Sequence, residues 1–555
     1  MKHWKVLKKE FLKEGFDVDD IINVLLENRN IISKTERDDY LFPKLSNVTI
    51  KSTGIEVDET AKTIQRIKDA ILKNEKIVIY GDYDVDGICG TAILWETIYS
   101  FYKNVFPYIP HRVDEGYGLS IAGIDNLEST IKDVGLIITV DNGIVAHKAV
   151  EYAKSKGIDV VITDHHVAGD KMPDAFSIVH TTQICGTGVA YLLACEISKE
   201  IHNSESTVQH SLELVALATV ADLVPLKNHN RTLLLHGLKK LKQTTRKGLL
   251  ALFNESSIKK EDVGVYQIGH MISPRLNAAG RISYAMDGLR LICTTDEVRA
   301  QKLARTLNEI NKERQNLTFA SADAAKIEIQ KDEIGSILIS ASSEYDQGIV
   351  GLIASRLVEE FYRPSIAISI GDKISKGSAR SIQGVNIVEL IRSVPEFLKE
   401  AGGHPMAAGF SIDTKNLEDF KAALSRKATE VISYELFTRE LLIDLELDFK
   451  FLTLELIQKI NTLSPFGMGN PQPVFMTKNV SVLRANRVGK DNAHLQLLLE
   501  KDGVIFKGIL FRADAELQLE QNQLVDVVYT VDINEWNGKK SMELRVRDIS
   551  ISRFT

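Results

Sequence analysis

The stretch from Ile77 to Thr91, IVIYGDYDVDGICGT, joins an apolar run directly to a cluster of carboxylates. Its first four residues, IVIY, predict a buried strand, and the small residues after the acidic cluster predict a tight turn into a helix that begins near Ile88. The sequence therefore places Asp82, Asp84 and Asp86 at the carboxyl end of a strand. Carboxylates that alternate on an extended or looped backbone can converge on one cation. Taken alone, the same motif is equally compatible with an acidic surface turn.

Composition limits the classes of protein to consider. The chain has 555 residues, enough for roughly three or four domains of about 150 residues each. Its formal net charge of -7 provides no overall basic field, so a nucleic-acid partner would need a local basic groove. The four cysteines are scattered without a CxxC pair, which argues against a zinc site or a disulfide framework. No apolar run has the length of a signal peptide core or a membrane span, so we expect a soluble, cytoplasmic protein.

The chain beyond the acidic cluster alternates between strands and helices. We expect strands at 105–109, 136–140 and 160–163, separated by segments of helical length. This alternation is typical of a parallel sheet with helices on both faces. In such sheets ligands bind at the carboxyl ends of the strands, so the residues that follow each strand matter most.

Metal-capable side chains follow these predicted strands. LIITV leads directly into Asp141, and VVIT leads directly into Asp164, His165 and His166. Farther along, Asp222 interrupts the apolar segment LELVALATVADLVPL, where an unpaired carboxylate would be costly to bury. Taken alone, each of these residues could simply belong to a capped loop or to the end of a helix. Together they predict a site of hard oxygen ligands with imidazole, a composition that favours Mn²⁺ or Mg²⁺.

The chemistry that suits these residues is phosphodiester hydrolysis. Two divalent ions about 4 Å apart can bridge a phosphate, generate a hydroxide nucleophile and stabilise the leaving oxygen of an in-line displacement. The sequence therefore predicts a two-metal hydrolase.

The motifs resemble those of the DHH phosphoesterase superfamily, named for the sequence found here at 164–166, and within it the RecJ exonuclease family. Four motifs carry the likeness in the family's order: GDYDVDG at 81–87, TVDNGI at 139–144, TDHH at 163–166 and LATVADLVPL at 217–226. The likeness continues through PRLNAAGRI at 274–282, SKGSARS at 375–381, GGHPMAAGF at 402–410 and SPFGMGNPQPVF at 464–475. It covers nearly the whole chain.

The resemblance implies a role for each residue of the predicted metal site. The core ligands that it implies are Asp84, Asp86, Asp141, His165 and Asp222. Asp82 would be a further ligand, and Asp141 would bridge two ions. His166 would complete the catalytic set by facing the phosphate, and Asp164 would orient a histidine from behind the ligands.

Two further motifs predict phosphate-binding groups. A Gly-Gly pair lets backbone N–H groups approach an anion closely, a histidine can donate beside them, and an arginine can bind phosphate oxygens with two N–H groups. The residues expected to bind phosphate or DNA are Arg275, Asn277, Arg281, Arg380, Gly402, Gly403 and His404. A plain Gly-Gly turn and ordinary surface arginines are the alternatives.

We expect an α/β protein with a parallel-sheet DHH domain, joined by a long helix to a smaller α/β DHHA1 domain and followed by a β-barrel OB-fold. The expected parts are an N-terminal helical segment (1–50), the DHH domain (51–295), the connector helix (296–332), the DHHA1 domain (333–438) and the nucleic-acid-binding OB-fold (439–555). The first helix is expected from Lys2 to about Asn30, with Phe11 and Phe16 on its apolar face. The barrel residues that are candidates for contacting single-stranded DNA are Phe466, Phe475, Arg484, Arg487, Lys490 and Trp536. Each of them could instead be a core residue or an ordinary surface residue.

The function implied by the resemblance is a 5′ to 3′ exonuclease of single-stranded DNA, acting in DNA repair and recombination with two Mn²⁺ or Mg²⁺ ions. Candidate protein partners are a single-strand-binding protein or a helicase. Two alternatives stay open: a DHH phosphodiesterase of short oligonucleotides or cyclic dinucleotides, and a non-enzymatic replication scaffold. The presence of every core ligand argues against the scaffold.

The chain departs from the family pattern in three places. The segment between His166 and Gly186 is short, IVH at 178–180 lacks the usual Asn-Pro, and Tyr80 stands where many relatives have histidine. None of these changes removes an expected ligand. They leave the contacts to the substrate and to its 5′ end open.

Overall fold

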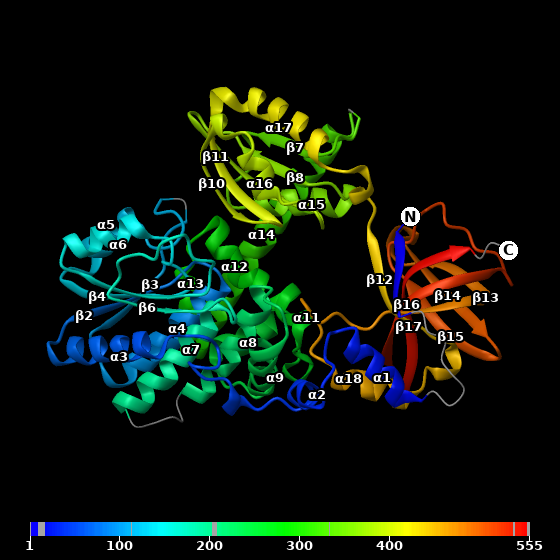
Figure 1. Ribbon diagram of the computed structural model, residues 1–555, viewed down its shortest axis with the longest axis horizontal. Helices are drawn as coiled ribbons and strands as arrows, with labels where there is room; N and C mark the ends of the chain where they lie inside the picture. Colours follow the sequence, from blue (N-terminus) through cyan, green and yellow to red (C-terminus); the bar gives the residue numbers. More distant parts are fainter. Residues whose placement is uncertain are drawn as a thin grey trace. The chain divides into compact units, whose positions relative to one another are not determined.

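The protein folds as two compact units (Figure 1). The computed structural model describes residues 2–8, 17–112, 114–202, 208–331, 333–536 and 539–551, with the backbone alone for 534–536 and 539–540. One unit is made of residues 1–44, 225–231 and 438–555, and the other of residues 45–224 and 232–437. The segment 225–231 thus belongs to the same unit as the two ends of the chain.

A five-stranded parallel sheet in the order β3-β2-β4-β5-β6 supports the predicted metal site. Its strands are β2 (Lys76–Tyr80), β3 (Val105–Tyr108), β4 (Val134–Thr139), β5 (Asp159–Asp164) and β6 (Ser177–His180). Helices α5 (Ile121–Ile131) and α6 (His147–Ser155) cover one face, and α3 (Val57–Leu72), α4 (Val85–Phe101) and α7 (Gly186–Ile197) cover the other (Figure 1). Burial on both faces explains why the strands read as continuous apolar runs. The parallel α/β fold predicted from the sequence is confirmed.

A helical region follows the sheet. Its main helices are α8 (Leu212–Ala221), α9 (Asn228–Leu241), α10 (Lys247–Glu255), α12 (Ser273–Ile282), α13 (Met286–Cys293) and α14 (Glu297–Ile329). The expected long helix is α14, with 33 residues and an Asp296 N-cap that accepts from the Arg299 N–H. Its first half packs on α10 and α12, and its second half packs on α15 (Val350–Phe361). None of the helices in the described ranges is both long and apolar enough to cross a membrane.

The smaller α/β part has a mixed sheet in the order β10-β11-β9-β8-β7. The strands are β7 (Leu338–Ser342), β8 (Ser365–Ser369), β9 (Ile374–Arg380), β10 (Leu398–His404) and β11 (Ala407–Asp413), and only β7 and β8 pair in parallel. Helices α16 (Ile387–Arg392) and α17 (Leu417–Val431) share a buried core with the sheet. This arrangement presents the β9 arginine and the β10–β11 hairpin on adjoining strands.

The barrel unit contains five strands that close on themselves. They are β13 (Phe475–Val488), β14 (His494–Lys501), β15 (Val504–Leu510), β17 (Lys539–Ile551) and β16 (Leu524–Trp536), and pairing of β13 with β16 closes the barrel. Helices α1 (Val18–Glu27) and α18 (Leu454–Thr462) bury apolar residues in the same core as the barrel, and α2 (Lys34–Leu41) adds Tyr40. The expected barrel is confirmed.

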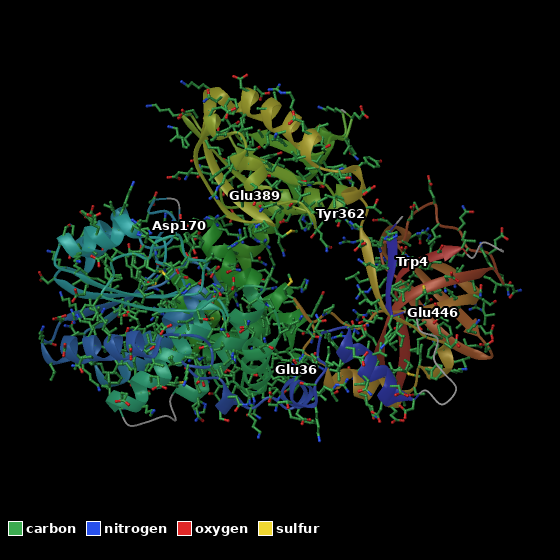
Figure 2. The ribbon with its side chains drawn as sticks, viewed as in Figure 1. Trp4, Glu36, Asp170, Tyr362, Glu389 and Glu446 are labelled. Carbon is green, nitrogen blue, oxygen red and sulfur yellow. The ribbon has the colours of Figure 1, made fainter. Side chains whose placement is uncertain are left out.

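The prediction of a helix from Lys2 onward is wrong for the first described residues. His3–Lys8 form strand β1, which pairs in parallel with β12 (Glu440–Glu446). In HWKVLK the apolar residues alternate, so Trp4 and Val6 face a small cluster around Ile443 while the residues between them stay exposed. The Trp4 ring N–H also donates to Asp548 Oδ2 (2.8 Å), and Trp4 is labelled in Figure 2. The expected apolar positions Phe11 and Phe16 lie outside the described residues.

Candidate metal centre

The candidate ligands gather where three neighbouring parallel strands end. Strand β2 lies between β3 and β4, and the register pairs Tyr80 with Thr139. Strand β4 pairs with β5 at Ile138 and Val161, so the residues that follow both strands reach the same edge of the sheet. The backbone N–H of Asp141 completes this alignment by donating to Thr163 O (3.0 Å).

The three aspartates after β2 fall into two of the groups of side chains that could hold a metal ion. Helix α4 begins at Val85, earlier than expected, and Asp84 is its N-cap, with Oδ1 accepting from the N–H groups of Asp86 (2.9 Å) and Gly87 (3.2 Å). Asp86 therefore lies in the first turn of the helix that Asp84 caps. Asp82 and Asp84 group with Asp141, whereas Asp86 groups with His165 and Asp222.

The amino end of α7 holds Asp86 in place. Its two carboxylate oxygens accept from the N–H groups of Gly186 and Thr187, each at 2.7 Å. The Thr187 hydroxyl donates back to Asp86 O (2.6 Å). Charge-assisted hydrogen bonds at a helix amino terminus suit a carboxylate, so the orientation of Asp86 is determined before any cation binds.

Asp141 occupies the centre of the arrangement. It is 2% exposed, its φ is +63°, and its Oδ1 has no hydrogen-bond partner. Gly186 makes room for it, because a Cβ at Gly186 would lie 2.7 Å from both Cβ and Oδ1 of Asp141. A buried, unsatisfied carboxylate oxygen in a strained backbone position is a feature of functional sites.

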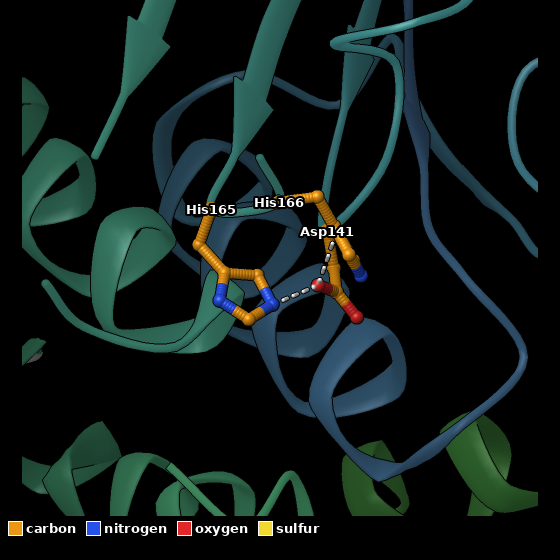
Figure 3. Close-up of side chains that lie close together, drawn as sticks. All are labelled: Asp141, His165 and His166. Carbon is orange, nitrogen blue, oxygen red and sulfur yellow. Dashed lines mark ion pairs between the residues drawn. The ribbon is translucent and has the colours of Figure 1, made fainter. Parts of the chain in front are cut away.

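Both imidazoles point toward the same Asp141 carboxylate oxygen (Figure 3). His165 Nε2 lies 3.1 Å from Asp141 Oδ1, 3.7 Å from Asp86 Oδ2 and 3.6 Å from Asp222 Oδ2, yet it makes no hydrogen bond. His166 Nδ1 lies 2.8 Å from Asp164 Oδ1 and 3.9 Å from Asp141 Oδ1. His165 Nε2 and Asp141 Oδ1 thus face each other without a hydrogen-bond partner, as the ligand atoms of a metal ion do.

Asp164 organises the two histidines from behind. Its Oδ1 accepts from the backbone N–H groups of His165 (2.7 Å) and His166 (3.1 Å), and its Oδ2 accepts from Ile144 N–H (2.9 Å). Burial opposes a charge on His166, but the hydrogen bond and charge of Asp164, together with Asp222 and Asp82, raise the pKa of His166 to about 9. His166 is therefore a cation at neutral pH when no metal is bound.

The carboxylates cannot all be ionised at this spacing without a counter-charge. Burial, followed by repulsion from neighbouring carboxylates, raises the pKa of Asp82 and of Asp141 well above the ordinary value. The same causes raise the pKa of Asp222 to about 8. Bound cations would remove both penalties. The residues present therefore fit a pair of Mn²⁺ or Mg²⁺ ions, with Asp141 shared between two of the three ligand groups.

Removing the metal should make the stability of the protein fall as the pH rises. Because the pKa of Asp222 is about 8 in the folded chain and about 3.9 when unfolded, the folded state holds a proton that the unfolded state has released. That stabilising contribution is complete below about pH 4 and is lost toward about pH 8. The measurement is the melting temperature of the EDTA-treated wild type minus that of EDTA-treated Asp222→Asn at each pH. We expect this difference to decrease from about pH 5 to about pH 8. Added Mn²⁺ should raise the melting temperature of the wild type most at about pH 8. A constant difference between the two proteins contradicts this expectation.

The residues expected to bind phosphate fall into two sets. Arg275 donates to Asn308 Oδ1 (3.0 Å) and Met271 O (2.5 Å), and Asn277 Oδ1 accepts from Val85 N–H (2.9 Å). Arg275 thus binds α14, and Asn277 binds the start of α4 next to the aspartates. A phosphate-binding role for the two residues stays a prediction. The other set consists of Arg281 and Arg380, which form no ion pair with a carboxylate in the described part of the chain, together with Gly402, Gly403 and His404 of the β10–β11 hairpin.

Arg281 is surrounded by cations. Burial comes first among the causes that lower its pKa to about 10, followed by repulsion from Arg112, Arg314 and Arg380. Among the described residues none of these four has an ion pair with a carboxylate, and the guanidinium of Arg380 lies over the first turn of α15, 2.8 Å from where a Cβ of Gly351 would be. A desolvated cluster of one sign is stabilised by binding an anion.

Sequence reasoning missed Arg112, Arg314 and the hydroxyl of Tyr117. Tyr117 lies 3.3 Å from His166 Nε2, and the Arg112 guanidinium lies 5.1 Å from the ring of Tyr83. Arg112 follows the end of β3. Because ligands bind at that edge of the sheet, its position could have identified it as a candidate binding residue. Arg314 is one of many basic residues on α14, and no sequence signal distinguishes it.

Most of the barrel side chains that were candidates for contacting single-stranded DNA make contacts within the protein instead. Phe475 is 1% exposed and belongs to the core, so it is wrong as a strand contact. Phe466 packs against the same core, and Arg487 donates to the carbonyls of Ala513 (3.2 Å) and Leu517 (3.0 Å). Arg484 and Lys490 are exposed, whereas the side chain of Trp536 lies outside the described residues.

The fold and the site are those of a DHH phosphoesterase. The sequence model of the DHH family, N-terminal domain, matches residues 76–219, that of the DHHA1 domain matches residues 335–430, and that of the RecJ OB domain matches residues 443–548. The chain belongs to the RecJ family of single-stranded-DNA-specific exonucleases.

Individual relatives support this assignment. The chain is 33% identical over 557 residues to the single-stranded-DNA-specific exonuclease RecJ of Bacillus subtilis, covering 98% of this chain and 67% of the relative. It is 31% identical to RecJ of Salmonella typhimurium, covering 88% and 89%. Its structure matches that of RecJ from Thermus thermophilus in complex with Mn²⁺ with a TM-score of 0.85 and 26% identity, covering 100% of this chain and 80% of the other. A second structure of that protein, in complex with Mg²⁺, matches with a TM-score of 0.79.

Proposed function

We propose that the protein is an exonuclease that hydrolyses single-stranded DNA from the 5′ end toward the 3′ end. The observation that carries the proposal is the convergence of carboxylates and His165 Nε2 in three ligand groups, of which two contain Asp141 and two contain His165. When bound there, two divalent ions supply a hydroxide nucleophile and stabilise the leaving oxygen of the phosphodiester. The 5′ to 3′ polarity is inferred from membership of the RecJ family.

The protein's own residues hold and orient the reacting groups. Asp82, Asp84 and Asp141 form one ligand group, and the fixed carboxylate of Asp86 contributes to another. His166, held by Asp164, places a proton donor beside Asp141, where a non-bridging phosphate oxygen of the substrate would lie. Tyr117 limits the rotation of this ring through its hydroxyl.

The arginine cluster is the site for a substrate phosphate. Burial and then repulsion from Arg112 lower the pKa of Arg281 and that of Arg380, and no carboxylate in the described part of the chain forms an ion pair with these three arginines. Each guanidinium can bind phosphate oxygens with two N–H groups, and the amino end of α15 adds its dipole. Binding a phosphate would therefore relieve repulsion and form new hydrogen bonds in the same step.

The GGH hairpin lies beside this cluster in the smaller sheet. His404 pairs with Ala407 across the hairpin, and Ala407 pairs with Arg380 on β9. The two glycines before His404 are exposed, and a Cβ at Gly402 would have no atom within 4 Å. An approaching strand can therefore reach the backbone of the hairpin, which suits the proposed phosphate role.

Arg380→Ala should lower kcat/KM for single-stranded DNA by about tenfold to a hundredfold, because hydrogen bonds to a charged group contribute about 1.5–3 kcal/mol. Mn²⁺ affinity should stay the same, since Arg380 is not a metal ligand. The matched control is Arg290→Ala, which removes an exposed arginine whose partner is Asp287 (2.8 Å). Equal kcat/KM for the two variants would remove Arg380 from the phosphate site.

The assay that tests the function uses DNA labelled at either end, single- or double-stranded, with Mn²⁺, Mg²⁺ or EDTA. We expect release of label from the 5′ end of single strands and no reaction in EDTA. Preference for dinucleotides or cyclic dinucleotides over long strands would favour the alternative phosphodiesterase, which would have no use for the barrel. Action in cytoplasmic DNA repair and recombination, with a single-strand-binding protein or helicase as partner, stays a prediction that co-purification can test.

A further inference from the structure

A continuous helical segment, residues 265–282, carries two exposed aromatic rings. It consists of α11 (Val265–Gln267), the π-helical turn η5 (Ile268–Ile272) and α12, which follow one another without a break (Figure 1). Ile268 and Ile272, four residues apart, are fully buried, whereas Tyr266 and His270, also four residues apart, are exposed. The segment is therefore anchored by one face and presents the two rings on another. Turns of π-helix are rare and occur frequently at functional sites.

The two rings are stacked on one another. Their centroids are 4.5 Å apart, and their planes differ by 18°. Tyr266 is 63% exposed, and His270 Nδ1 lies 3.2 Å from the backbone oxygen of Tyr266. Because each ring restricts the movement of the other, a further flat ring can stack on the pair with little additional loss of side-chain entropy.

The segment packs against both helices that carry ligands of the proposed metal centre. A Cβ at Gly269 would lie 3.7 Å from Val220, in the last turn of the helix that ends at Asp222. Farther along the segment, Asn277 Oδ1 accepts from the Val85 N–H (2.9 Å) at the start of α4. Since the glycine immediately precedes the second ring, the stacked pair lies beside the Asp222 end of the centre.

The other end of the segment reaches the arginine cluster. Arg281 belongs to that cluster and lies near the end of α12, and residues 266–281 of a helix span about 20 Å. The segment thus passes the arginine cluster, the start of α4 and the end of α8 in this order, and the stacked pair comes last. A strand with its first phosphate at the arginines therefore passes the metal centre before it reaches the pair.

We propose that Tyr266 and His270 form a stacking platform for a base of the single-stranded substrate, on the 3′ side of the scissile phosphodiester. The inference rests on the proposed exonuclease function and adds a base-binding site to it. Every base has an aromatic face, so such a platform accepts any sequence. The faces of a base in a duplex are covered by its neighbours, so the platform also favours single strands over duplexes.

Tyr266→Ala should lower kcat/KM for a long single strand by about fivefold to a hundredfold, the usual cost of losing one base–aromatic stack. A dinucleotide is too short to extend from the arginines to the platform, so its kcat/KM should stay at the wild-type value. Tyr266→Phe keeps the ring and should behave as the wild type on both substrates. Equal losses on both substrates would assign the pair to support of the metal centre, and an unchanged kcat/KM on long strands would leave it to another partner. Either result overturns the platform.

An abasic scan locates the contact along the strand. Each substrate carries one abasic nucleotide at a different distance from the 5′ end. At one position on the 3′ side of the scissile bond, the wild type should become as slow as Tyr266→Ala, and the substitution should have no further effect there. A difference between the two proteins that is the same at every abasic position would contradict base stacking.

The matched control is Tyr99→Ala. Tyr99 is 40% exposed and stacks on Trp95, four residues before it, with ring centroids 5.0 Å apart, but it lies at the opposite end of α4 from Asp86. This variant should keep wild-type kcat/KM on both substrates, and a loss equal to that of Tyr266→Ala would overturn the platform. Absence of metal-dependent hydrolysis by the wild type would instead overturn the proposed function, so the two failures are distinguishable.

Discussion

Asp141→Ala should lower the rate of metal-dependent DNA hydrolysis by about a thousandfold or more, equivalent to about 4 kcal/mol of transition-state stabilisation. Asp141 belongs to two of the three ligand groups, so its loss affects both ends of the centre. The measurement is kcat on a 5′-labelled single strand at saturating Mn²⁺, together with the number of Mn²⁺ ions bound. Near-normal hydrolysis by a folded variant would contradict the two-metal assignment.

Thermal unfolding separates this effect from a loss of structure. Burial and four neighbouring carboxylates raise the pKa of Asp141, so its charged form destabilises the metal-free protein. Asp141→Ala removes that charge and should melt no lower than the wild type in EDTA. Added Mn²⁺ should stabilise the wild type much more than the variant. A variant that melts much lower in EDTA would indicate a structural role.

Gly186→Ala should reduce kcat by about a hundredfold, because a shift of about 1 Å in a catalytic group costs about that much. The new Cβ would lie 2.7 Å from Cβ and Oδ1 of Asp141, closer than real Cβ contacts allow. Gly186 is also the first residue of α7, and its N–H donates to Asp86 Oδ2. The substitution therefore displaces two candidate ligands without removing any.

The control for this substitution is Gly169→Ala. At Gly169 the nearest heavy atom to a new Cβ is Lys171 O, at 3.9 Å, and the residue is exposed and lies outside the helices and strands. We expect wild-type kcat and Mn²⁺ affinity from this variant. Wild-type Mn²⁺ affinity in Gly186→Ala as well would show that the centre adapts to the added methyl group.

Local patterns were enough to predict the parallel sheet and to select the candidate ligands. Each of β2, β4 and β5 is a short apolar run that leads directly into aspartate or histidine, and a parallel sheet brings such ends to one edge whatever its surroundings. The long helix α14 was likewise evident from composition. These features depend on residues that are close in sequence, so they can be predicted without knowledge of the tertiary structure.

The N-terminal strand shows where local reasoning fails. HWKVLK has an alternating pattern too short to distinguish from a charged amphipathic helix, and its strand partner, β12, lies more than 400 residues away in sequence. The core of the barrel likewise includes residues of α1. Removal of the chain from about Arg439 onward would therefore remove the strand partner of β1 and expose the apolar face of α1.

Local order along the chain was enough to identify the candidate metal ligands and the strands that precede them. The grouping of the aspartates depends on where α4 begins and on the amino end of α7, so it became visible in the folded protein alone. The same holds for the cluster of Arg112, Arg281 and Arg380, which form no ion pair with a carboxylate in the described part of the chain. Electrostatic repulsion and burial act between residues distant in sequence, so the pKa shifts arise only when the chain is folded.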